Sequence, residues 1–439
     1  MTLSIHRLVS NPERRSPLNM SLFSVKVLVN SVLFFAVLAH SQAPKSVFDS
    51  KGMVASRSAI ASEVGAKILA SGGNAIDAAV SVGFALAVTY PSAGNLGGGG
   101  FMVIRLADGQ VVANDHREKA PGKATRDMYL DANGEIVDGL STKSHLASGV
   151  PGTVAGLIDV LEAYGSMELV EVIQPAIDLA RDGFILDEDL AGQFKRRLES
   201  FSKYPGSLEV FSSDGEPYET GDRFSQPDLA KTLERIKLAG KKGFYAGETA
   251  DLIVAEMKNG GGIISLADLE DYESKWRKPI MGDYRGYKLV SMPPPSSGGV
   301  LLVQMLNMLE PYDLGKLGVG SSKVIHLMIE AERRAYADRA EHLGDSDFYD
   351  VPIETLISKD YARERFSDFD PNKASVSADI FAGVAAKEGL ETTHASVIDA
   401  MGNAVAYTTT LNLSYGSKIV VRGAGFLLNN EMDDFSAKE

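Results

Sequence analysis

The sequence contains no cysteine among its 439 residues. Disulfides, thiolate metal sites, iron–sulfur clusters and a cysteine nucleophile are therefore excluded, and any covalent chemistry must use serine, threonine, lysine or a carboxylate. Basic residues are fewer than acidic ones. The chain has 44 lysines and arginines and 58 aspartates and glutamates, which gives a formal net charge of −14. This surplus would repel a phosphate backbone, so nucleic acid is not an expected partner.

Long apolar runs are scarce, and one of them lies near the N-terminus. Residues 27–39 (VLVNSVLFFAVLA) follow Lys26 and precede several small residues. This run is shorter than the roughly 20 residues that a membrane-spanning helix needs. It predicts a signal peptide over residues 1–41, with cleavage after Ser41 or Ala43, and therefore a periplasmic or secreted protein. An uncleaved N-terminal membrane anchor is the less favoured alternative.

Hydrophobic periodicity predicts alternating short strands and helices in the rest of the chain. Asn74 is expected to cap a helix over residues 75–90, which is apolar on almost every side and should be buried. Several other segments carry a clear strand or helix pattern: residues 53–56, 101–105 and 111–113 as strands, and 60–71, 174–183, 229–238 and 300–309 as helices.

A glycine-rich segment, residues 95–100 (NLGGGG), precedes the second expected strand. A phosphate-binding loop is one interpretation. The Walker pattern ends in Gly-Lys-Ser/Thr, which is absent here. Close backbone packing or a substrate-facing loop is the better interpretation.

The pattern of polar and apolar residues changes near the C-terminal end. Residues 367–390 are polar and aperiodic, which indicates a surface linker. Residues 394–399 and 404–412 then predict a hairpin whose strands, rich in small and β-branched residues, are expected to be covered on both faces.

This junction suits a threonine nucleophile. Threonine is weakly nucleophilic unless a base lies beside it, and an N-terminal threonine can use its own α-amine. An internal threonine must first be exposed by cleavage, and Glu391-Thr392 joins the flexible linker to the hairpin. A threonine that merely begins a strand is the alternative, and it is common.

Several ordered motifs carry a resemblance to a known family. Residues 391–394 (ETTH), 410–412 (TLN) and 427–436 (LLNNEMDDFS) resemble the γ-glutamyltranspeptidase (glutathione hydrolase) family. Earlier segments agree, and the similarity runs from about residue 46 to the last residue: 72–79, 95–101, 117–121, 148–153, 283–287 and 293–299.

The resemblance implies an α+β fold, the αββα four-layer sandwich of N-terminal-nucleophile hydrolases. It also implies a precursor that cleaves itself at Glu391-Thr392. Residues 42–391 would form the large subunit and residues 392–439 the start of the small subunit of a heterodimer. It further implies no metal and no other cofactor, and substrates such as glutathione with water, amino acids or peptides as acceptors.

The resemblance assigns roles to individual residues. Thr392 would be the nucleophile, and the hydroxyl of Thr410 would assist it. Four side chains would bind the γ-glutamyl moiety: Arg117 its α-carboxylate, Glu431 and Asp434 its α-ammonium, and Asn412 a further group. A planar guanidinium suits a carboxylate. Taken singly, these residues also have ordinary structural interpretations. Arg117 could belong to a surface ion pair, Asp434 to a solvent-exposed turn, and Thr410 to a strand without a catalytic role.

One departure from the family pattern concerns the C-terminal end. The family's small subunit continues beyond the acidic motif, whereas only 48 residues follow from Thr392 to Glu439, both included. We therefore expect a C-terminally truncated chain. It would lack a serine pair at the carboxylate site, the paired-glycine oxyanion donors and a lid segment. Loss of one oxyanion donor costs about 10²–10³ in rate.

Three alternatives remain at this point. A cephalosporin acylase or a poly-γ-glutamate-processing relative would share the nucleophile. A catalytically inactive binding or scaffold protein would share only the ancestry. A metallohydrolase has little support, because the seven histidines show no metal-ligand spacing.

Overall fold

The computed structural model describes residues 46–381 and 392–435. The chain divides into two units, Met1–Asp49 and Ser50–Glu439, and every element named below belongs to the second. The predicted signal peptide and Glu391 lie outside the described residues. Within the described ranges, no helix combines the length and the apolar character that a bilayer crossing requires.

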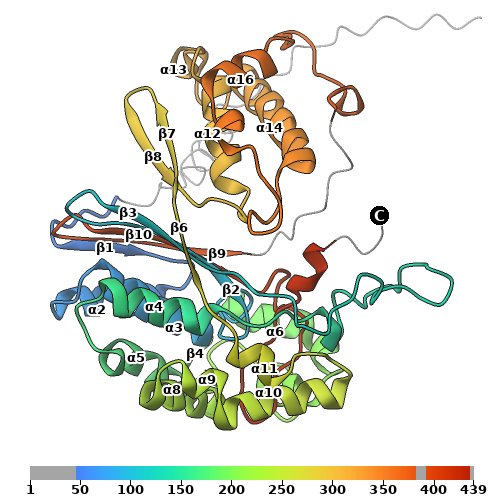
Figure 1. Cartoon of the computed structure of the whole chain (residues 1–439). Helices are drawn as coiled ribbons and strands as arrows, with labels where there is room; N and C mark the ends of the chain where they lie inside the picture. The colour runs from blue at the N-terminus through green and yellow to red at the C-terminus, as the bar shows by residue number, and fades with distance from the viewer. Residues whose placement is uncertain (1–45, 382–391, 436–439) are drawn as a thin grey trace, which may run out of the picture. The chain divides into compact units, whose positions relative to one another are not determined.

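A six-stranded antiparallel sheet forms the centre of the second unit. Its strand order is β1-β9-β10-β2-β3-β6 (Figure 1). The bounds of the strands, in that order, are Gly52–Ala55, Thr393–Asp399, Ala404–Thr410, Gly99–Arg105, Val111–His116 and Lys275–Arg277. The hairpin of β9 and β10 thus lies inside the sheet, with β9 next to β1, and β10 pairs with the strand that follows the glycine-rich segment.

Helices cover one face of this sheet in successive layers (Figure 1). The first layer contains α2 (Ala59–Ala70), α3 (Ala75–Thr89) and α4 (Thr153–Tyr164). The remaining elements of this helical part are α5 (Leu169–Asp182), β4 (Phe184–Ile185), α6 (Glu188–Phe201), α7 (Pro205–Phe211), β5 (Arg223–Phe224), α8 (Pro227–Ala239), α9 (Lys242–Tyr245), α10 (Gly247–Gly260), α11 (Leu266–Glu270) and the 3-10 turn η1 (His145–Ala147).

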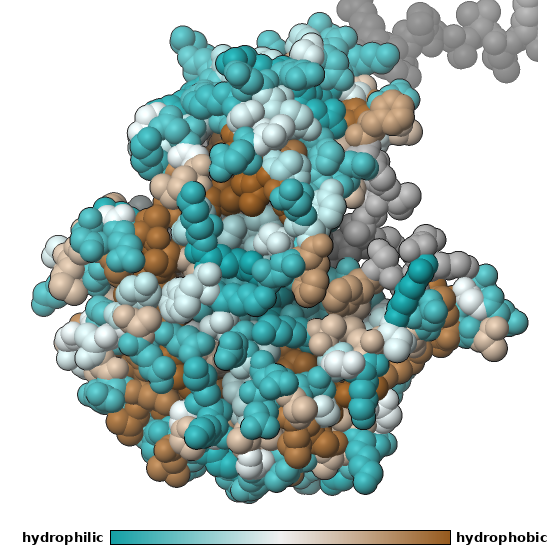
Figure 2. All heavy atoms as spheres, in the orientation of Figure 1, coloured by the Kyte–Doolittle hydropathy of each residue, from teal (hydrophilic) through white to brown (hydrophobic). Residues whose placement is uncertain are grey.

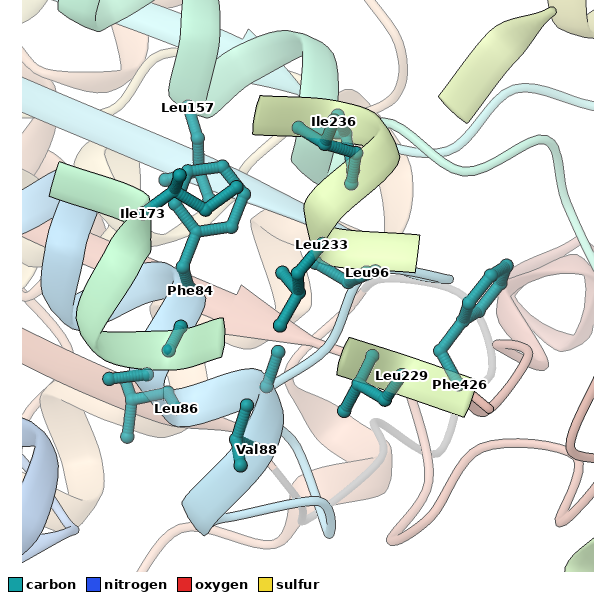
Figure 3. Packing of buried hydrophobic residues seen from close by; sticks show 14 of the residues in the cluster. Phe84, Leu86, Val88, Leu96, Leu157, Ile173, Leu229, Leu233, Ile236 and Phe426 are labelled. Carbon is teal, nitrogen blue, oxygen red and sulfur yellow. The ribbon is translucent and has the colours of Figure 1, made fainter. Parts of the chain in front are cut away.

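The prediction of a fully buried helix after Asn74 is confirmed. All residues of α3 are buried, and Asn74 and Asp77 form a reciprocal capping box at its start. Helix α3 is apolar all round because it packs between the sheet and α5. Figure 3 shows side chains of α3, α4, α5 and α8 in this core, and Leu96 and Phe426 belong to the same cluster.

A second group of elements follows β6 along the chain. The hairpin β7 (Ile280–Tyr284) and β8 (Tyr287–Ser291) packs on α12 (Gly298–Leu309), and α12 packs on α14 (Ser322–His342). The shorter elements of this group are α13 (Leu314–Leu317), α15 (Ile353–Leu356), α16 (Lys359–Arg365) and η2 (Ser377–Asp379). Its small cores are separate from the main one.

Polar side chains dominate the face seen in Figure 2, with apolar atoms in separate patches.

The glycine-rich segment serves close backbone packing, as predicted. A Cβ atom on Gly97 would collide with the carbonyl oxygen of Leu427, and one on Gly100 with that of Thr408. Side chains larger than hydrogen would therefore push β10 and the C-terminal segment away from β2.

The expectation that the hairpin strands are covered on both faces is wrong for the described residues. In β9 the residues alternate strictly, with Ala395 and Val397 buried and His394, Ser396 and Ile398 exposed. Antiparallel strands place successive side chains on opposite faces, and here only one face packs on helices. Small and β-branched residues on both faces concealed this alternation in the sequence.

Close packing at Gly97 can be tested by adding one methyl group. We expect Gly97→Ala to lower the free energy of unfolding by about 1–3 kcal/mol, because the backbone of Leu427 must move. Gly344→Ala is the matched control, since its new Cβ meets only Tyr349 at ordinary contact distance, 3.8 Å. Urea unfolding measures both variants, and equal stabilities would contradict this packing role.

Candidate active site

All six residues assigned to catalysis or substrate binding line one cleft. The cleft has a volume of about 660 Å³, which lies in the range of small-molecule sites. Gly100, Phe101 and residues of α12 and α14 also line the cleft. The six residues themselves are Arg117, Thr392, Thr410, Asn412, Glu431 and Asp434. Residues separated by more than 300 positions in the sequence therefore meet at one place. In the described ranges, no group of three metal-ligating side chains is present.

The hairpin of β9 and β10 brings Thr392 and Thr410 to the cleft. Thr392 is exposed and immediately precedes β9, whereas Thr410 is buried at the last position of β10. The Thr410 hydroxyl accepts a hydrogen bond from the backbone N–H of Asn412 at 2.9 Å. Asn412 adopts a positive φ of 72°, and its side chain donates to the backbone of Asn430 at 3.0 Å. The end of β10 is therefore tied to the acidic motif.

Two buried asparagines hold the walls of the cleft together. The Asn429 amide donates to the carbonyls of Gly97 and Gly149, both at 2.8 Å, and accepts from the N–H groups of Gly149 and Glu431. All four hydrogen-bonding positions of this amide are thus used. Asn95 acts similarly, donating to the backbone of Thr410 at 2.8 Å and accepting from Gly98.

Arg117 follows the end of β3 and reaches the acidic motif in η3 (Glu431–Asp434). Its guanidinium pairs with Glu431 and, at 2.7 Å, with Asp434. Glu431 is buried, whereas half of the Asp434 side chain is exposed. Burial lowers the pKa of Arg117, but the acidic neighbours Glu431, Glu118 and Asp434 outweigh this effect and raise it, so the guanidinium stays charged. The cleft therefore holds a fixed cation beside two carboxylates.

Glu118 adds a further buried acid beside this pair. Both of its carboxylate oxygens are buried without a hydrogen-bond partner among the described residues. Burial raises the pKa of Glu118 to about 7, although the charge of Arg117 opposes the shift. Burial likewise raises the pKa of Glu431 well above its usual range, and the charge of Glu118 adds to this. Three acids, Glu118, Glu431 and Asp434, thus surround the guanidinium of Arg117, and their mutual repulsion favours proton uptake by this cluster.

Sequence reasoning did not assign roles to Asn95, Asn429 or Glu118. The asparagines belong to segments that carried the family resemblance, but no pattern showed that their amides would be fully buried. Glu118 directly follows Arg117 and read as part of the same polar segment. Its burial depends on β2 and on the segment near Gly149, whose packing is set by tertiary structure.

The fold and the cleft define a class of protein. A threonine at the start of a central strand, beside a second hydroxyl and a charged cleft, on a sheet covered by helices, is the arrangement of N-terminal-nucleophile hydrolases. Comparison with known proteins agrees with this class. The family model for γ-glutamyltranspeptidase matches residues 61–439. The chain belongs to the γ-glutamyltranspeptidase family of enzymes.

Individual relatives support the assignment. The glutathione hydrolase proenzyme of Escherichia coli strain K12 is 53% identical over 390 residues, covering 88% of this chain and 67% of the relative. The acylase ACY 1 proenzyme of Pseudomonas sp. strain V22 is 41% identical, covering 89% of this chain and 71% of the relative. The crystal structure of γ-glutamyltranspeptidase from Helicobacter pylori has 50% identity and a TM-score of 0.76, covering 79% of this chain and all of that one.

The raised pKa of Glu118 predicts that the free energy of unfolding depends on pH. Below the pKa of an unfolded glutamate, about 4.3, Glu118 is protonated in both states and its burial costs no ionisation. As pH rises toward 7, the unfolded chain loses this proton before the folded one does, so stability falls. We expect Glu118→Gln to lose less stability than the parent chain between pH 5 and pH 7, by roughly 2 kcal/mol.

Urea unfolding at the two pH values measures this difference. Glu162→Gln is the matched control, because Glu162 is exposed and should leave the pH dependence unchanged. A parent chain and a Glu118→Gln variant with parallel pH profiles would show that Glu118 is ionised throughout.

Proposed function

We propose that this enzyme transfers the γ-glutamyl group of glutathione to water or to an amino acid through an ester on Thr392. The observation that carries the proposal is the meeting of Arg117, Thr392, Thr410, Asn412, Glu431 and Asp434 in one cleft. The family assignment and the names of the relatives support the same reaction.

The enzyme is proposed to begin as a single chain that cleaves itself. The Thr392 hydroxyl attacks the carbonyl carbon of Glu391, and the acyl group moves from nitrogen to oxygen. Water then hydrolyses this ester, which leaves a carboxylate on Glu391 and a free α-amine on Thr392. The proenzyme names of the relatives support a processed, two-chain product.

The cleft suits the zwitterionic end of a γ-glutamyl compound. Arg117 is the fixed cation for the α-carboxylate, and Glu431 and Asp434 provide the negative charge for the α-ammonium. These groups also pair with one another. The carboxylate of a bound zwitterion can replace the acids as the partner of Arg117, and its ammonium can replace Arg117 as the partner of the acids. The ammonium also supplies the positive charge that keeps Glu431 ionised, whereas burial alone raises its pKa.

Transfer then follows in two steps. The α-amine of Thr392, with a pKa near 8 in peptides, accepts the proton of its own hydroxyl as the oxygen attacks the γ-amide carbonyl. The proton passes to the leaving amine, cysteinylglycine when glutathione is the donor. Water or an amino-acid amine attacks the resulting ester, which releases glutamate or a new γ-glutamyl amide and restores Thr392. The Thr410 hydroxyl is proposed to assist the nucleophile, and its hydrogen bond from the N–H of Asn412 supports this role.

A cephalosporin acylase activity is less favoured. An acyl group without an α-ammonium would leave the buried Glu431 with no substrate charge to balance it. The 41% identity to an acylase proenzyme is also lower than the 53% identity to a glutathione hydrolase proenzyme.

Export is proposed for the compartment. The apolar run over residues 27–39 and the absence of cysteine support a secretory signal over residues 1–41. The mass of the protein recovered after expression reports whether this segment is removed.

Self-cleavage gives the first test of the nucleophile. We expect intact-mass spectrometry to find the chain split between Glu391 and Thr392, and Thr392→Val to remain whole, because valine keeps the shape and lacks the hydroxyl. Thr393→Val is the matched control. It removes the hydroxyl of the neighbouring residue, which is buried and has no hydrogen-bond partner among the described residues, so it should still be cleaved.

Two results would contradict the assignment. A split in Thr392→Val would place the nucleophile elsewhere. A single uncut mass for the parent chain would favour an inactive binding or scaffold protein with the same ancestry.

Charge pairing in the cleft makes a second prediction. We expect L-glutamate to bind at least about tenfold more tightly than glutarate, because glutarate lacks the ammonium that faces Glu431 and Asp434. Titration calorimetry at constant salt measures both affinities. Equal binding of the two acids would show that the acidic pair does not contact the ligand.

A further inference from the structure

Arg117 lies just beyond the point where the sheet stops supporting the backbone. The last pair between β2 and β3 joins Gly100 to His116. The residue that would hold the substrate carboxylate is therefore the first one outside the ladder. Its backbone N–H and C=O need other partners if the guanidinium is to keep one position.

Both of these backbone groups are bonded to side chains. The N–H of Arg117 donates to Asp115 Oδ1 at 3.0 Å, and the C=O accepts from the Tyr272 hydroxyl at 2.8 Å. Arg277 Nε in turn donates to Asp115 Oδ2 at 2.6 Å, and Arg277 Nη2 donates to Asp347 at 2.8 Å. Two independent contacts thus fix the main chain at residue 117.

A single short segment supplies Tyr272, which makes one of these contacts, and Arg277, which holds the Asp115 side chain that makes the other. Tyr272 follows α11, and Arg277 ends β6, which pairs with β3 so that Lys275 lies opposite Asp115. These side chains are largely buried, with 6% of Tyr272 and 13% of the Arg277 side chain exposed. Tyr272 stacks on Tyr245 with an interplanar angle of 4°. A rigid aromatic pair therefore aims the Tyr272 hydroxyl.

We propose that Tyr272 and the Asp115–Arg277 pair are positioning residues, which set the guanidinium of Arg117 for the α-carboxylate of the substrate. The inference rests on the proposed function, because it takes Arg117 as the carboxylate ligand. None of the three is among the residues that line the cleft. They act by restraining the backbone from which Arg117 extends, and a charge-assisted bond between a guanidinium and a carboxylate weakens quickly when either group is displaced.

The structure offers a matched pair of variants. Tyr272→Phe removes only the hydroxyl that holds Arg117 and leaves the ring on its stack. Tyr245→Phe makes the same chemical change in the stacked partner, whose hydroxyl bonds Pro151 and Ala155 instead. Both variants lose buried hydrogen bonds, so both should lower stability, but only the first releases Arg117.

Calorimetry with L-glutamate is the first readout. We expect Tyr272→Phe to weaken binding about 5- to 10-fold and Tyr245→Phe by less than twofold, at comparable losses of thermal stability. Arg277→Lys keeps the charge beside Asp115 and should weaken binding less than Arg277→Gln. Unchanged affinity in Tyr272→Phe, or equal losses in the two phenylalanine variants, would overturn the proposal.

Hydrogen exchange provides a readout that needs no ligand. The N–H of Arg117 stays bonded to Asp115 only while the main chain is held, and Tyr272 holds it at the C=O of the same residue. In the free protein we therefore expect the Arg117 amide to exchange about tenfold faster in Tyr272→Phe, and at the parent rate in Tyr245→Phe. An unchanged rate in Tyr272→Phe would overturn the positioning role whether or not glutamate binds. Failure of the parent chain to bind L-glutamate, with the exchange difference present, would contradict the proposed function and leave the positioning role supported.

Discussion

The site depends on the hydrogen bonds of two buried asparagines. Asn95 ties the glycine-rich segment to the end of β10, and Asn429 ties that segment to the acidic motif and to Gly149. These four segments do not adjoin in the sequence, and the two side-chain amides bond them to one another. Because an unmet buried donor or acceptor costs about 1–3 kcal/mol, their closely approaching backbones stay together only while the amides are satisfied. Gly97 and Gly100 permit that approach.

Charge balance gives this scaffold its chemical preference. One guanidinium, that of Arg117, is surrounded by Glu118, Glu431 and Asp434, and burial opposes ionisation of the two glutamates. Such a cleft is incomplete electrostatically until a ligand brings a cation and an anion together. The proposed substrates meet this requirement, because an α-amino acid end supplies both charges at a short fixed spacing.

Much of the fold could be predicted from sequence because it depends on local signals. The cap at Asn74, the uninterrupted apolar pattern of α3 and the turn before α12 each depend on neighbouring residues. The site residues followed from ordered motifs, and the structure places them in one cleft. Their roles stay predictions. The one-sided exposure of β9 and the buried carboxylate of Glu118 could not be read, since both depend on which distant segment covers a given face.

Thr392 is proposed to carry the γ-glutamyl group between donor and acceptor. The most direct measurement is to mix the protein with a γ-glutamyl amide, quench with acid after a short interval, and map the modified peptide by tandem mass spectrometry. We expect a γ-glutamyl ester on the hydroxyl of Thr392 that disappears when an amino-acid acceptor is added before the quench. A γ-glutamyl group on another side chain, or release of glutamate with no bound intermediate at any time, would contradict it.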